Sequence, residues 1–200
     1  LLWSQPIQIL DVALVPAGSD SLLLVLDPNG VTIYKKSGST WNAQQTLAVP
    51  RETAWPRDLR GRIALARDRM FDIYMPGVVC NSTTGSMLTL GCRQGDDPWP
   101  LAPNQSAFYA SARNFFTGVV TPVMGKQGSV PPFFSAAALA RPKYTLWVFA
   151  RTDATVHAFD GLNDIPLRSL NNLGSDLAAV NSGCGSGTQV LMTGPTGAGS

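Results

Sequence analysis

The fold class of this 200-residue chain is decided by one stretch, LDVALVPAGSDSLLLVLDPNGVTIYKKSGSTWNAQQTLAVP at residues 10–50. Segments rich in turn-forming residues, PAGSD, DPNG and KSGST, divide it into apolar or alternating segments. In DPNG, Pro28 fixes φ for a turn while Asn29 and Gly30 tolerate positive φ, so a hairpin is favoured there. The stretch therefore predicts short antiparallel strands at residues 11–15, 21–27, 30–35 and 41–49.

A similar spacing of strands and turns recurs further along the chain. Residues 61–101 form a second such unit, with strands expected near 62–66, 70–75, 78–81 and 87–92. A third unit covers residues 132–170, where YTLWVFARTDATVHAFDG parallels SLLLVLDPNGVTIYKKSG of the first. Residues 175–194 resemble the opening strand pair of a further unit, and residues 102–131, the least regular, are expected to hold a long loop and one strand.

The composition agrees with many short strands and turns. Glu52 is the only glutamate, whereas 19 Gly and 15 Pro are spread along a chain that is 44% hydrophobic. We therefore expect an all-β fold. The formal net charge of +2 is too small to imply a nucleic-acid or membrane partner by itself, and no apolar run reaches the length of a membrane-spanning helix.

The two ends of the sequence each match part of a known functional motif. The opening LLWSQPIQIL lacks the basic region and cleavage site of an intact signal peptide, which suggests a mature form or a fragment. The closing QVLMTGPTGAGS begins like a phosphate-binding loop, but it has no Lys and no following helix. Nucleotide binding is therefore not predicted.

The period of forty to fifty residues, with the strand endings VHAFDG and GVTIY, resembles the β-propeller superfamily, in particular extracytoplasmic bacterial propellers with degenerate repeats. This resemblance implies one all-β domain over residues 1–200, part of a longer propeller, with blade-like units near 10–50, 61–101 and 132–170. Residues 6–10 are a candidate for a strand that closes the ring. The resemblance supplies no site residues, and a β-sandwich remains an alternative fold.

The cysteines bear on the cellular compartment. Cys80 and Cys92 lie on two expected neighbouring strands with the turn STTGS between them, which favours a disulfide over two reduced thiols. A disulfide persists in an oxidising compartment, so we expect a periplasmic or secreted protein. Cys184 has no partner by this reasoning.

The segment RETAWPRDLRGRIALARDR, residues 51–69, is rich in arginine. Arg57 and Arg60 are candidates for binding an anion or an acidic polysaccharide, with Trp55 as a stacking surface. The alternative is that the arginines form solvated pairs with neighbouring aspartates such as Asp58.

The loop QGDDPWPL contains a second candidate site. Asp96 and Asp97 are candidates for a general acid and base or for cation ligands, and Trp99 for stacking on a sugar ring. The alternative is an Asx-type turn with Trp99 capping the core. His157 is expected to be a lone core or turn residue, because no serine stands in a nucleophile elbow.

Two functions are compatible with these patterns. The first is a non-catalytic extracytoplasmic binding or assembly protein that presents loops to a protein or glycan partner, without a cofactor or a metal. The second is a propeller-type enzyme, either glycan-cleaving through Asp96 or Asp97 or quinone-dependent, with part of its site outside this chain.

Overall fold

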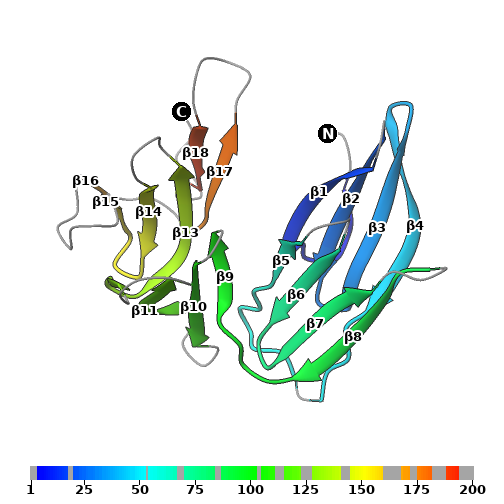
Figure 1. Cartoon of the computed structure of the whole chain (residues 1–200), viewed down its shortest axis with the longest axis horizontal. Helices are drawn as coiled ribbons and strands as arrows, with labels where there is room; N and C mark the ends of the chain where they lie inside the picture. Colours follow the sequence, from blue (N-terminus) through cyan, green and yellow to red (C-terminus); the bar gives the residue numbers. More distant parts are fainter. Residues whose placement is uncertain are drawn as a thin grey trace. The chain divides into compact units, whose positions relative to one another are not determined.

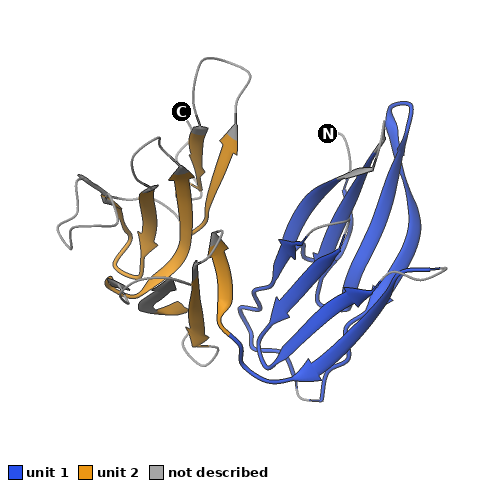
Figure 2. Ribbon diagram, viewed as in Figure 1, with its two compact units in different colours: residues 1–97 blue, residues 98–200 orange. Residues whose placement is uncertain are grey.

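The structure of the chain is a computed structural model, and it describes residues 4–17, 20–52, 54–66, 70–83, 87–102, 105–110, 115–122, 128–140, 145–159, 168–171, 175–181 and 188–193. All regular secondary structure within these residues is β-strand, which confirms the all-β prediction (Figure 1). The strands form several antiparallel sheets, and no closed propeller ring is seen among the described residues. The chain divides into two compact units, unit 1 at Leu1–Asp97 and unit 2 at Pro98–Ser200 (Figure 2).

Unit 1 contains two four-stranded antiparallel sheets whose strands follow one another in chain order. The first sheet consists of β1 (Asp11–Ala17), β2 (Asp20–Asp27), β3 (Gly30–Ser37) and β4 (Thr40–Ala48). The second consists of β5 (Arg62–Leu65), β6 (Phe71–Met75), β7 (Val78–Thr83) and β8 (Thr89–Gln94). Both sheets lie where the turn signals predicted strands, with their ends shifted by a few residues. Residues 6–10 form no strand of their own; the Leu10 amide donates to the Leu26 carbonyl at 2.8 Å beside β1.

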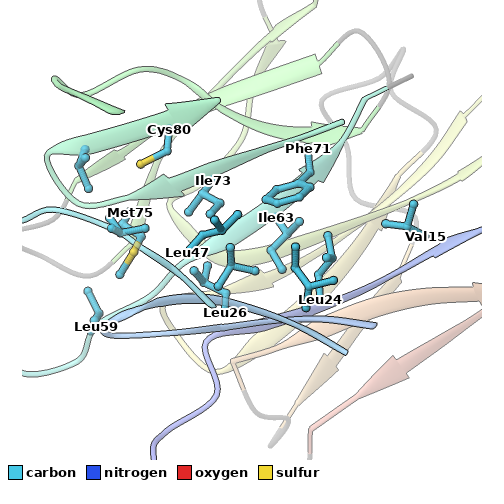
Figure 3. Close-up of a cluster of buried hydrophobic side chains, with 14 residues drawn as sticks. Val15, Leu24, Leu26, Leu47, Leu59, Ile63, Phe71, Ile73, Met75 and Cys80 are labelled. Carbon is cyan, nitrogen blue, oxygen red and sulfur yellow. The ribbon is translucent and has the colours of Figure 1, made fainter. Parts of the chain in front are cut away.

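The two sheets of unit 1 enclose a common apolar core, which we name the unit-1 core (Figure 3). The first sheet contributes Val15, Leu24, Leu26, Val31, Ile33 and Leu47, and the second contributes Ile63, Phe71, Ile73, Met75, Val78 and Cys80. Because each fully buried aliphatic or aromatic side chain contributes about 1.5–3 kcal/mol, this core is what holds the two sheets together.

The central strand β2 is apolar on both faces. Its run Leu22–Leu26 does not alternate, so Leu24 enters the unit-1 core while Val25, on the opposite face, is also buried. On that opposite face the neighbouring residues of β1 are exposed, Val12 at 53% and Leu14 at 57%. A continuous apolar run is typical of a strand that is covered on both faces.

The turn between β2 and β3 is held from several sides. The Asn29 amide donates to Asp27 Oδ1 at 2.8 Å, the Val49 amide donates to the Asn29 carbonyl at 3.0 Å, and Trp55 Nε1 donates to the Pro28 carbonyl at 2.9 Å. Gly30 has a φ of 147°, in agreement with the positive φ that a glycine in this turn tolerates. Asn29, by contrast, does not adopt positive φ. The side-chain hydrogen bond of Asp27 stabilises this turn instead, because it fixes the Asn29 amide in an Asx-type geometry.

Unit 2 is built around one large antiparallel sheet with the order β16-β15-β14-β13-β11-β10-β9, in which β12 also pairs with β11. Its strands are β9 (Trp99–Ala102), β10 (Gln105–Ala110), β11 (Phe115–Pro122), β12 (Gly128–Ser129), β13 (Phe133–Ala140), β14 (Thr145–Arg151), β15 (Thr155–Phe159) and β16 (Arg168–Asn171). A separate hairpin consists of β17 (Leu177–Asn181) and β18 (Thr188–Met192). Residues 102–131 thus hold more strands than the one that we expected, since β10, β11 and β12 all lie within them.

Both faces of the middle of this sheet are covered. On one face a chain of aromatic rings runs from neighbour to neighbour, with centroids 4.5–5.8 Å apart: Trp99, Tyr109, Phe116, Phe133, Phe149 and Trp147. On the other face Leu139, Val148 and Val156 pack with Leu177 and Val190 of the hairpin. The continuous apolar run of β14 therefore has both of its faces buried.

Candidate functional site

Cys80 and Cys92 form a disulfide, as the sequence predicted. They lie directly opposite each other on the paired strands β7 and β8. Cys80 is buried in the unit-1 core, and Cys92 packs against it. The disulfide therefore fixes the edge strand β8 to the core. Cys184 lies outside the described residues.

Asp96 stabilises the turn between β6 and β7. Its Oδ1 accepts a hydrogen bond from the Gly77 amide at 3.0 Å, and the Gly95 amide donates to the Gly77 carbonyl at 2.9 Å. Gly77 has a φ of 76°, a conformation that glycine adopts without a steric penalty. One carboxylate oxygen of Asp96 is thus used to hold a backbone turn.

Asp97 forms an ion pair with Arg93, four residues earlier in the chain. Both side chains are exposed, so solvent screens the pair and its contribution to stability is about 0–1 kcal/mol. Although they are adjacent, the two aspartates are thus directed to different partners, Asp96 to a backbone amide and Asp97 to a guanidinium. Within the described residues, no three His, Cys, Asp or Glu side chains are grouped so that they could hold a metal ion.

Trp99 is in unit 2 and is only 4% exposed. Its ring stacks on Tyr109 at a centroid distance of 4.5 Å and meets the edge of Phe116 at 5.8 Å. This is the core position that we considered as the alternative to sugar stacking. A buried indole does not offer its face to a sugar ring without moving its neighbours.

The arginine-rich segment is partly exposed: Arg57 and Asp58 are exposed in a turn, and Arg60 is half-buried. Trp55 is also half-buried, packs against the unit-1 core and donates to the Pro28 carbonyl, so its ring supports the β2–β3 turn. Of the other charged residues in this segment, those at positions 67–69 lie outside the described residues.

The sequence reasoning did not identify a connection between the two sheets of unit 1. Asp11 Oδ2 accepts a hydrogen bond from the Ile63 amide at 2.7 Å, and its Oδ1 accepts one from the Val12 amide at 2.8 Å. Burial raises the pKa of Asp11, outweighing these hydrogen bonds and the charge of Arg62, which act in the opposite direction. Burial also lowers the pKa of Arg62. The sequence feature that could have indicated this connection is the position of Asp11, an aspartate at the start of an apolar strand.

A second polar cluster lies at the turn between β14 and β15. Arg151 contacts His157 Nε2 through Nη1 at 2.6 Å and pairs with Asp153 through Nη2 at 3.1 Å. Thr155 Oγ1 donates to Asp153 Oδ1 at 2.6 Å, and this hydrogen bond is the main cause of the lowered pKa of Asp153. Burial, followed by the charge of Arg151, lowers the pKa of His157. His157 is therefore a half-buried, neutral partner of Arg151.

Among the described residues, no helix is long and apolar enough to cross a lipid bilayer. A comparison of the chain with protein-family models gives no match, and a comparison with curated protein sequences gives none either.

Proposed function

We propose that this chain is a non-catalytic, extracytoplasmic protein of β-propeller type that binds a protein or glycan partner through the turns between its strands. The observation that carries the proposal is the architecture of unit 1, where two consecutive four-stranded sheets in chain order enclose one core. Neighbouring propeller blades have this arrangement. A β-sandwich shares it, so a further observation is needed to choose between them.

That observation is an apolar patch on the outer face of the first sheet, at β1 and β2. Val12 and Leu14 are more than half exposed beside the buried Val25, on the side opposite the unit-1 core. A sandwich needs one apolar face per sheet, whereas a blade inside a ring has both faces covered by its neighbours. The apolar patch at β1 and β2 therefore favours a blade.

The disulfide and the candidate carboxylates support the rest of the proposal. A disulfide between Cys80 and Cys92 is expected to persist in an oxidising compartment such as the periplasm or the extracellular space. Asp96 and Asp97 are occupied by the Gly77 amide and by Arg93, and Trp99 is buried. These contacts favour a structural role for the loop over glycan cleavage.

The catalytic question is tested with the purified chain on glycan and peptide arrays, where binding and product formation are measured on the same samples. We expect saturable binding without turnover, in the wild type and in Asp97→Ala alike. Reproducible turnover that is lost in Asp97→Ala would contradict a non-catalytic role and favour the enzyme alternative.

The blade arrangement is tested by labelling cysteine variants with a maleimide in protein taken from its natural source. Leu14→Cys reports on the outer face of the first sheet, and Ser39→Cys, in the exposed β3–β4 turn, is the matched control. In a propeller, we expect Leu14→Cys to be protected until the protein unfolds while Ser39→Cys is labelled at once. Equal labelling rates would speak for a two-sheet sandwich.

A further inference from the structure

The two sheets of unit 1 are connected differently at their first strands and at their last strands. The first strands, β1 and β5, are joined by the hydrogen bond from the Ile63 amide to Asp11. The last strands of the two sheets are β4 and β8. Gln45 Nε2 of β4 donates a hydrogen bond to the carbonyl of Leu88, just before β8, at 2.7 Å. A groove of about 300 Å³ opens here, lined by residues 45–48 and 87–90.

The unit-1 core reaches the surface in this groove. Leu47 is part of the core, and Leu88 and Leu90 pack against it while remaining partly exposed. Met87, at the rim, is 66% exposed. None of the residues that line the groove is charged, so its floor is apolar and its walls are neutral. A charged ligand would lose its hydration here without gaining a partner.

The groove also offers hydrogen-bonding groups in a regular order. Among the described strands, β4 pairs only with β3, and β8 pairs only with β7. The outer edge of each therefore presents backbone N–H and C=O groups to which no other described strand is paired. An extended peptide has the matching series of groups and can add to such an edge, with alternate side chains entering the apolar floor.

We propose that the groove between β4 and β8 binds an extended, uncharged peptide segment of a partner protein, with the peptide backbone paired to a strand edge and an apolar side chain beside Met87 and Leu90. This goes beyond the proposed function and is independent of it, because it rests on unit 1 alone and requires neither a propeller nor an extracytoplasmic location. A sugar fits less well, since the lining contains no aromatic ring on which it could stack.

The test uses the full chain labelled with ¹⁵N and the uncharged peptide acetyl-TVSLTVS-amide as the probe. The backbone amides at positions 45–48 and 87–90 are followed as peptide is added to about 1 mM, a concentration suited to weak peptide binding. A second peptide has the same side chains but N-methyl groups at alternate residues, which remove half of its backbone donors. We expect saturable shifts at these positions with the first peptide and none with the second.

Two matched variants separate the groove from the rest of the surface. Met87→Glu places a charge at the groove rim, whereas Leu65→Glu places one on β5, outside the groove; both side chains are exposed, at 66% and 49%, so neither change enters the core. We expect Met87→Glu to weaken binding by about tenfold or more and Leu65→Glu to leave it unchanged.

Several outcomes would overturn the proposal. They are the absence of saturable shifts in the groove, equal binding of the N-methylated peptide, and equal binding by Met87→Glu. A concentration-dependent dimer of the free chain with shifts at the same positions would also overturn it, because the occupant would then be a second copy of this chain.

Discussion

Gly30 and Gly38 both have positive φ, at 147° and 62°, but their surroundings differ. A Cβ at Gly30 would overlap the Leu47 carbonyl oxygen, whereas a Cβ at Gly38 would meet no atom within 4 Å. We expect Gly30→Ala to lower the free energy of unfolding by about 3 kcal/mol and Gly38→Ala by about 1 kcal/mol. Urea unfolding of both variants measures the difference, and equal losses would show that the contact with Leu47 adds nothing.

His157 makes the fold sensitive to mild acid. Its pKa is lowered in the folded protein from the ordinary value of 6.5, so folding favours the neutral ring beside Arg151. This stabilisation is complete above pH 6.5 and is lost as the pH falls through the lowered folded pKa, because the unfolded chain then binds the proton first. We expect His157→Gln to remove this part of the pH dependence.

The measurement for His157 is thermal unfolding across this pH range. Since the chain contains one histidine, imidazole titration between neutral and mildly acidic pH is attributable to it. Identical profiles for wild type and His157→Gln would contradict the prediction. Asp153→Asn provides the control for the neighbouring ion pair, because it removes the charge that pairs with Arg151 but keeps His157.

At the scale of the element, the disulfide connects the edge strand β8 to β7 and so to the unit-1 core. It closes a loop with a sequence separation of 12 residues. In the chain-entropy description, closing a loop of this size stabilises the folded state by about 3 kcal/mol. We expect the double variant Cys80→Ala, Cys92→Ala to lose about this much in urea unfolding. A change below about 0.5 kcal/mol would show that the bridge constrains a part of the chain that is already ordered in the unfolded state.

The hydrogen bond from Ile63 to Asp11 joins the first and second sheets. Replacing Asp11 by alanine leaves the Ile63 amide without this acceptor, and we expect a loss of about 1–3 kcal/mol. Because the pKa of Asp11 is raised, the folded state retains its proton at pH values where the unfolded chain has released it. The stability due to Asp11 therefore falls as the pH rises above 3.8 through the folded pKa.

The cost of Asp11→Ala is accordingly expected to be larger near pH 4 than at neutral pH. Urea unfolding of wild type and variant at both values gives the comparison. A cost that grows toward neutral pH would mean that the ionised carboxylate is the stabilising form and that burial is not the dominant influence on its pKa.

At the scale of the whole molecule, unit 1 has what an independent domain needs. Its core, its disulfide, the Asp11 hydrogen bond and the Arg93–Asp97 ion pair all lie within residues 1–97. We expect a chain of residues 1–97 to fold alone and to unfold in one cooperative transition. Dispersed amide signals in its NMR spectrum, at the positions they have in the full chain, are the measurement. A collapsed spectrum would show that unit 1 depends on residues of unit 2.

Much of unit 1 was predictable because its determinants are local. PAGSD, DPNG and KSGST mark turns through residues that prefer turn dihedrals, and the strands between them follow from what remains. The disulfide was predictable for the same reason, since Cys80 and Cys92 are on paired strands that follow each other in the chain. In unit 2 we expected a long loop and one strand over residues 102–131, whereas the structure has β10, β11 and β12 there.

The candidate site was less predictable, because the role of each residue depends on which group its side chain contacts in the folded chain. From the sequence, Asp96 and Asp97 were candidates for catalysis or cation binding, with an Asx-type turn as the favoured alternative. Their assignment came from Gly77, 19 residues earlier than Asp96, and from the direction of the Arg93 side chain. The role of Trp99 likewise followed from its stacking on Tyr109.

The sequence by itself thus determined that this protein is all-β, approximately where the strands of unit 1 lie, and which cysteines are joined, since each depends on residues close together in the chain. Only the tertiary structure decided which apolar faces meet, that Asp11 binds the Ile63 amide 52 residues away, and that β4 and β8 leave a groove between them. The physical reason is that apolar burial is non-directional: an apolar strand specifies that it must be covered, but not by what.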